Sequence, residues 1–106
     1  MKIVFDQGTP LPLRREFSGH QVETALEMEW QDLTNGDLLR EAEKAFDLLI
    51  TTDQNLRYQQ DLRGRRLAIL VLTTTSWPRI RKEVEQVVAA ALAMKPGEFR
   101  EFDFAE

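Results

Sequence analysis

The sequence contains no cysteine and only one histidine, His20, among its 106 residues. Without cysteine, disulfide bonds, thiol nucleophiles and cysteine-ligated zinc are all excluded. A single histidine excludes metal sites built from several histidines and argues against a Ser-His-Asp triad. The groups that remain for chemistry are carboxylates, hydroxyls, amides and arginines.

The sequence also lacks a long hydrophobic run. The longest uncharged apolar stretches, residues 67–72 and 87–94, are far shorter than the ~20 residues that span a bilayer. Asp6 interrupts the first apolar run too early for the core of a signal peptide. We therefore expect a cytoplasmic protein with no membrane segment.

Length and composition indicate a single globular domain over residues 1–106, with 42% hydrophobic and 30% charged residues. The net charge of −4 argues against a general nucleic-acid binder, but the charge is unevenly distributed. Residues 16–47 hold nine acids, and residues 57–82 hold seven bases. This distribution indicates either an acidic pocket beside a basic surface or chance clustering on a solvated surface.

Apolar patterning predicts alternating strands and helices. Strands are expected at residues 2–5, 20–26, 48–52, 67–72 and 99–104. A short helix is expected at 13–17, an amphipathic helix after residue 34, a helical turn within 54–61, and the longest helix from Trp77 to the breakers at 95–97. The alternation predicts a small three-layer α/β/α sandwich with a mostly parallel sheet, in which 48–50 and 67–72 are central.

Three acids lie just after predicted strands or in the first turn of a predicted helix, positions where binding and catalytic sites are often found. Asp6 follows the first strand and Asp53 follows the third, so both stand at carboxyl ends of strands. Ligands of open α/β sheets bind outside those ends, where the strand order reverses. Asp37 lies in the first turn of the helix before the third strand. If the three carboxylates converge, a hard cation such as Mg²⁺ is the usual compensation for their repulsion.

Each of these residues also has a structural explanation. Asp37 can complement the helix dipole, with Thr34 or Asn35 as the N-cap. Asp6 and Asp53 can act as turn formers, because aspartate readily accepts hydrogen bonds from nearby backbone amides. An arginine cluster before the fourth strand can be a soluble turn or a set of phosphate contacts; it consists of Arg63, Arg65 and Arg66.

Four segments together resemble the short PIN-like nucleases, a family related to VapC-type toxins of toxin–antitoxin pairs. They are MKIVFD at residues 1–6, NGDLL at 35–39, LITTDQNL at 49–56 and YQQDL at 58–62. The similarity runs from the first strand through the strand at 67–72, and it depends on the order and spacing of the segments.

The resemblance implies a PIN-like fold and a Mg²⁺- or Mn²⁺-dependent ribonuclease site. Asp6, Asp37 and Asp53 match the family's acids and would be the catalytic metal ligands. Many relatives carry acids where this chain has Gln7, Asn35 and Asn55, which would be weaker or indirect ligands through their amide oxygens. The resemblance also implies an RNA substrate held by Arg57, Arg63, Arg65 and Arg66, and a small antitoxin as the protein partner.

Three functions are therefore weighed on the sequence. The first is a metal-dependent endoribonuclease, the toxin of a toxin–antitoxin pair, with homodimer formation left open. The second is a PIN-like module that has lost catalysis and binds a partner protein. The third is a receiver-like signalling domain, in which Asp53 would accept phosphate near Mg²⁺ held by Asp6. Receiver domains carry paired acids after the first strand, whereas this chain has Asp6 followed by Gln7.

Overall fold

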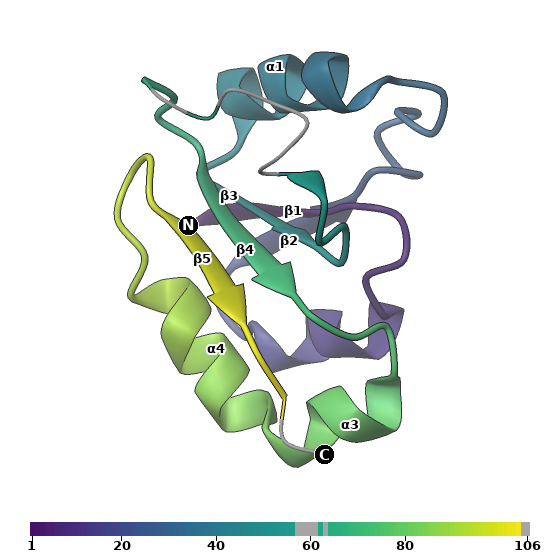
Figure 1. Ribbon diagram of the computed structural model, residues 1–106, viewed down its shortest axis with the longest axis vertical. Coiled ribbons are helices and arrows are strands. Elements are labelled where there is room, and N and C mark those ends of the chain that lie inside the picture. The colour runs from purple at the N-terminus through teal and green to yellow at the C-terminus, as the bar shows by residue number, and fades with distance from the viewer. Residues whose placement is uncertain (57–61, 63, 105–106) are drawn as a thin grey trace.

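Five parallel strands form one sheet in the order β2-β1-β3-β4-β5 (Figure 1). The computed structural model describes residues 1–56, 62 and 64–104. The strands are β1 (Lys2–Phe5), β2 (Gln21–Thr24), β3 (Leu48–Thr51), β4 (Ala68–Leu72) and β5 (Phe99–Phe102). The helices are η1 (Leu11–Glu16, a 3-10 helix), α1 (Asn35–Ala45), α3 (Trp77–Lys82) and α4 (Val84–Leu92).

The sequence correctly predicts which strands are central. Every residue of β3 and β4 is buried, because these strands pair with neighbours on both sides and both of their faces are covered. Uninterrupted apolar runs such as LLI and AILVL are typical of such strands. The edge strands β2 and β5 instead mix buried or half-buried with exposed positions. The α/β class and the parallel sheet are thus confirmed, and the sheet is parallel throughout its five strands.

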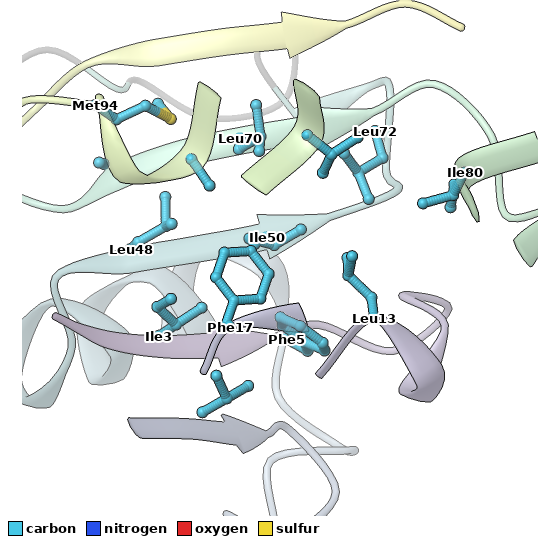
Figure 2. Close-up of a cluster of buried hydrophobic side chains, with 14 of the residues drawn as sticks. Ile3, Phe5, Leu13, Phe17, Leu48, Ile50, Leu70, Leu72, Ile80 and Met94 are labelled. Atoms are coloured by element: carbon cyan, nitrogen blue, oxygen red, sulfur yellow. The ribbon is translucent and has the colours of Figure 1, made fainter. Parts of the chain in front are cut away.

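Two separate cores lie on the two faces of the sheet. In β1, Ile3 and Phe5 point to one face and Val4 to the other, as the period of two in a strand requires. The first core also contains side chains of η1, α3 and α4, among them Leu13 and Ile80 (Figure 2). The second core contains the apolar side of α1. Figure 1 shows α1 on one side of the sheet and η1, α3 and α4 on the other, which gives the three layers expected.

Helix α1 begins at Thr34, the N-cap residue whose hydroxyl accepts a hydrogen bond from the N–H of Asp37 at 3.3 Å. Such a cap satisfies one of the amide groups left without a partner at a helix start. Leu38, Leu39 and Ala42 are the buried residues of the helix. Asn35, in the first turn, is thereby fixed near the carboxyl ends of β1 and β3.

The long helix predicted from Trp77 is broken into α3 and α4. Glu83, between them, has φ −123° and ψ 24°, and its N–H donates to the carbonyl of Ile80 at 3.0 Å, three residues back. Ile80 and Val87, on either side of the break, are both fully buried in the first core. The break changes the direction of the chain (Figure 1), so packing of both segments on the sheet overrides the helical periodicity of the sequence.

Candidate functional site

Asp6 and Asp53 lie together where the order of the sheet reverses. The chain leaves β1 for β2 on one side, and β3 pairs with β1 on the other side. Both acids follow the carboxyl ends of these strands, the place where open α/β sheets bind ligands. They line one hollow of about 240 Å³, called here the carboxylate hollow. Its lining residues are Asp6, Gln7, Trp30, Gln31, Leu33, Asn35, Leu38 and Asp53. The expectation that Asp6 and Asp53 face one crevice is confirmed.

Thr51, the last residue of β3, connects the two acids. Its hydroxyl donates to Oδ2 of Asp6 at 2.9 Å and accepts from the backbone N–H of Asp53 at 3.1 Å. The side chain is fully buried, so this hydroxyl fixes both acids without itself reaching solvent. Thr51 is not among the site residues predicted from the sequence, although its position at the end of an apolar strand, two residues before Asp53, could have indicated it.

Asp6 is held in a half-buried turn that disfavours its charge. Burial raises the pKa of Asp6 above its ordinary value of 3.8, hydrogen bonds from Thr51 and from the N–H of Gln7 oppose that rise, and the charge of Asp53 adds to it. The Gln7 amide donates to Oδ1 of Asp6 at 2.8 Å. Like-charge repulsion between two carboxylates, with few opposing groups, is the environment that a cation relieves.

Asp53 accepts hydrogen bonds on both of its carboxylate oxygens. The side-chain amide of Asn35 donates to Oδ2 at 3.1 Å, and the backbone N–H of Asn55 donates to Oδ1 at 3.0 Å. Asn35 therefore reaches the site through its side chain, as expected for an indirect ligand. Asn55 contacts Asp53 through its backbone, while its side chain is exposed and outside the lining of the hollow. Gln7 lines the hollow.

Asp37 does not join the other two acids, which corrects the expectation of three converging carboxylates. Its carboxylate pairs with the guanidinium of Arg40, one turn further along α1, and both side chains are largely exposed. Its backbone N–H is capped by Thr34. The first turn of α1 directs Asn35 toward Asp53 and leaves Asp37 outside the hollow lining. The helix-dipole explanation for Asp37 therefore describes its position.

Arg65 and Arg66 lie at the opposite edge of the sheet from the acids. Arg65 and Arg66 precede Ala68, the amino end of β4, and parallel strands place all amino ends at one edge. Arg65 pairs with Glu43 at 3.5 Å, and the N–H of Arg66 donates to Glu43 at 2.7 Å. Arg65 and Arg66 therefore do not line the carboxylate hollow, and their contact with an RNA backbone stays a prediction. Arg57 and Arg63, also proposed as RNA contacts, lie outside the described residues.

The donors in the carboxylate hollow suit a hard divalent cation. Asp6 and Asp53 supply carboxylate oxygens, and Asn35 and Gln7 carry amide oxygens. Mg²⁺ is commonly held by one or two carboxylates and completes its shell with waters and substrate phosphates. Within residues 1–56, 62 and 64–104, no three acids or histidines gather into a cluster suited to a metal. The two-carboxylate set therefore matches a cation that shares its coordination with a bound ligand.

Comparison of the chain with models of protein families, with curated proteins and with solved structures finds no match. No helix in the described part of the chain is long and apolar enough to cross a membrane.

Proposed function

We propose that the chain is a PIN-like endoribonuclease that depends on Mg²⁺ or Mn²⁺ and acts in the cytoplasm as the toxin of a toxin–antitoxin pair. The observation that carries the proposal is the placement of Asp6 and Asp53 side by side at the β1–β3 reversal, fixed by Thr51. Oxygen ligands at this position, without histidine or cysteine, support metal-assisted phosphodiester hydrolysis above chemistry that needs a histidine base or a thiol.

In the proposed mechanism the carboxylates of Asp6 and Asp53 would hold the metal. A bound Mg²⁺ or Mn²⁺ supplies an activated water and neutralises charge that develops on the phosphoryl oxygens. Thr51 holds the Asp6 carboxylate through Oδ2, and Asn35 holds Asp53 through its Oδ2. These two contacts restrict the rotation of the carboxylates, which a metal site needs from its surroundings.

Cleavage of single-stranded RNA by the purified protein tests the proposal. We expect slow cutting with Mn²⁺ or Mg²⁺, none with EDTA, and none for Asp6→Asn or Asp53→Asn, which each remove one ligand charge with little change in shape. Asp37→Asn is the matched control, because Asp37 pairs with Arg40 outside the hollow. It should keep full activity and lose about 0.3–1 kcal/mol of stability.

Growth of bacteria that express the protein gives a second readout. The wild type should slow growth, and Asp6→Asn should relieve the effect. If the wild type and Asp6→Asn are equally inert on every RNA and on growth, the nuclease proposal is wrong. The alternative is then a PIN-like module that binds a partner protein, such as a small antitoxin, without catalysis.

The strand order favours one further candidate, a receiver-like signalling domain. The order β2-β1-β3-β4-β5 is that of flavodoxin-like folds, including signalling receivers, whose ligands bind at the β1–β3 reversal. Asp53 would then accept a phosphoryl group. Incubation with acetyl phosphate followed by intact mass measurement separates the candidates, because only the receiver gains a phosphoryl adduct, which Asp53→Asn abolishes.

A further inference from the structure

A second hollow of about 350 Å³ lies beside the carboxylate hollow. It is enclosed by the loop after β1, by η1 and by the chain just after β2, and it is called here the apolar hollow. Asp6 and Gln7 line both hollows, so they form the boundary between them. The two hollows are therefore adjacent, with the Asp6 and Gln7 side of each facing the other. Its volume is at the small end of ligand pockets, which measure about 300–1,000 Å³.

Two large apolar side chains of the apolar hollow are exposed to water. Leu11 is 61% exposed and Leu26 is 65% exposed, and together with the buried Phe5 they make part of its lining. They are the two most exposed of the large hydrophobic side chains among the described residues. Burying them against a flat apolar ligand would be favourable, because it removes apolar area from water.

A bidentate ion pair between Arg14 and Glu27 forms another part of the lining. Arg14 donates to Glu27 through both terminal nitrogens, Nη2 to Oε1 at 2.6 Å and Nη1 to Oε2 at 3.2 Å. The guanidinium is also fixed by donation from Nε and Nη2 to the carbonyl of Val22, at 3.2 Å and 2.7 Å. The sequence does not show this pair, because its members are thirteen residues apart.

The carboxylate of Glu27 keeps the capacity to accept a further hydrogen bond. Oε1 already accepts from Arg14 and from the N–H of Thr24 at 2.9 Å. Oε2 accepts one bond from Arg14 among the described residues, and a carboxylate oxygen can accept two. The hydrogen bond from Arg14 also lowers the pKa of Glu27, so at neutral pH this oxygen is an acceptor and not a donor.

We propose that the apolar hollow is a nucleobase subsite that selects a base with an exocyclic amino group over uracil. The base would insert between Leu11 and Leu26 with its amino edge toward the Arg14–Glu27 pair and donate its amino hydrogen to Oε2 of Glu27. Cytosine is paired with acidic side chains in this way through its N4 amino group. The role as a substrate subsite rests on the proposed nuclease function, because the phosphate next to the base would then lie at Asp6 and Asp53.

An apolar side chain of a protein partner is the competing occupant of the same hollow. The remaining acceptor capacity of Oε2 of Glu27 and the adjacent carboxylates favour a base, because an apolar side chain would use neither. The test below treats this occupant as an outcome.

The first experiment measures base binding without any phosphate, so it depends on neither metal nor cleavage. Protein with labelled leucine methyl groups is titrated in EDTA with the nucleosides cytidine and uridine, and the methyl signals are followed by NMR. We expect cytidine to shift the signals of Leu11 and Leu26 but not that of Leu92, an exposed leucine on α4. Cytidine should bind about tenfold more tightly than uridine, because one hydrogen bond to a charged group is at stake.

Three variants separate base recognition from a structural effect. Leu26→Ser should weaken cytidine binding several-fold without changing the unfolding midpoint, since the side chain is exposed. Leu92→Ser is the matched control and should leave cytidine binding unchanged. Glu27→Gln keeps the shape of the side chain and replaces one acceptor oxygen with a donor amide. It should remove the preference for cytidine over uridine.

The outcomes distinguish this proposal from the nuclease proposal. If cytidine binds with the stated preference over uridine and the protein cleaves no RNA, the base site is supported and the nuclease proposal is overturned. RNA cleavage with equal or absent binding of the two nucleosides overturns the base site and leaves the nuclease standing. If neither nucleoside binds and the protein self-associates unless Leu26 is replaced by serine, the hollow is a protein contact and the base site is wrong.

Discussion

The hydroxyl of Thr51 donates a 2.9 Å hydrogen bond to Oδ2 of Asp6 across the pairing of β1 with β3. The donor is fully buried, and the acceptor is a half-buried carboxylate beside a second carboxylate. This contact favours the charged form of Asp6, whereas burial and Asp53 disfavour it. The charge of Asp6 therefore depends in part on Thr51, which is not itself an acid.

Replacing Thr51 with valine should destabilise the protein and weaken its metal binding. The change keeps the shape of the side chain but removes the donor to Asp6 and the acceptor for the N–H of Asp53. Buried partners left unsatisfied cost about 1–3 kcal/mol, which urea unfolding measures. Thr51→Ser is the control and should keep both the hydrogen bonds and the rise in melting temperature that Mn²⁺ produces. Equal metal response of the two variants would contradict this role.

The stability of the metal-free protein should carry a pH signature from Asp6. Its pKa is raised in the folded state above the ordinary value of 3.8, so the folded protein binds this proton more readily than the unfolded chain does. The free-energy cost of folding with Asp6 charged is fully present above the raised pKa, and it is relieved as the pH falls toward 3.8. Denaturation in EDTA from about pH 7 to about pH 4 should show wild type gaining stability relative to Asp6→Asn. A wild type that loses stability relative to Asp6→Asn on acidification would overturn the assigned cause.

Asn35 and Asn55 should respond differently when each is changed to aspartate. Asn35→Asp replaces the donor to Oδ2 of Asp53 with a third negative charge inside the carboxylate hollow. The metal-free variant should lose about 1–2 kcal/mol, more than the roughly 0.3–1 kcal/mol that a charge gains at the start of α1.

Calorimetric titration with Mn²⁺ checks the other half of that prediction. Asn35→Asp should bind Mn²⁺ more tightly than wild type, because carboxylates bind hard cations better than amides do. Asn55→Asp should change the affinity little, since only its backbone contacts Asp53. The assignment of Asn35 to the site is wrong if the two variants have the same affinity.

Gly8 should tolerate alanine less well than Gly19 does. Both have positive φ, +90° at Gly8 and +83° at Gly19, but a Cβ at Gly8 would lie 2.8 Å from Oγ1 of Thr52, whereas nothing lies within 4 Å at Gly19. Backbone strain alone costs about 1–2 kcal/mol, and forced packing adds about 1–3 kcal/mol. Gly8→Ala should therefore lose about 2–5 kcal/mol in urea unfolding, and Gly19→Ala about 1–2 kcal/mol. Equal losses would show that the turn after β1 can move away from Thr52.

Local pattern was sufficient to predict the sheet. The runs at β3 and β4 are apolar throughout because both faces are covered, and that property can be read from the chain alone. The break at Glu83 could not be predicted from the sequence, because the helical spacing of apolar residues continues through this position. Packing of Ile80 and Val87 on the sheet interrupts the helix there.

Part of the candidate site could also be predicted from the sequence. Asp6 and Asp53 could be paired because strand ends are predictable and parallel strands bring those ends to one edge. Which of Asn35 and Asp37 faces Asp53 depends on the orientation of the first turn of α1, which is set by the N-cap and by the burial of Leu38 and Leu39. The position of Arg65 could also have been predicted from the sequence. Residues just before a strand of a parallel sheet lie at the edge opposite to residues just after a strand.

The all-parallel order of the strands has a consequence for how quickly this chain reaches its native state. No hairpin contributes to the sheet, since all four of its pairings are parallel, and parallel neighbours need a crossover connection. A crossover must therefore close, with its loss of chain entropy, before any ladder of the sheet can form. Refolding should accordingly be slow compared with a helical bundle of the same length, and the unpaired strands β3 and β4 would be the segments most prone to aggregation while it proceeds.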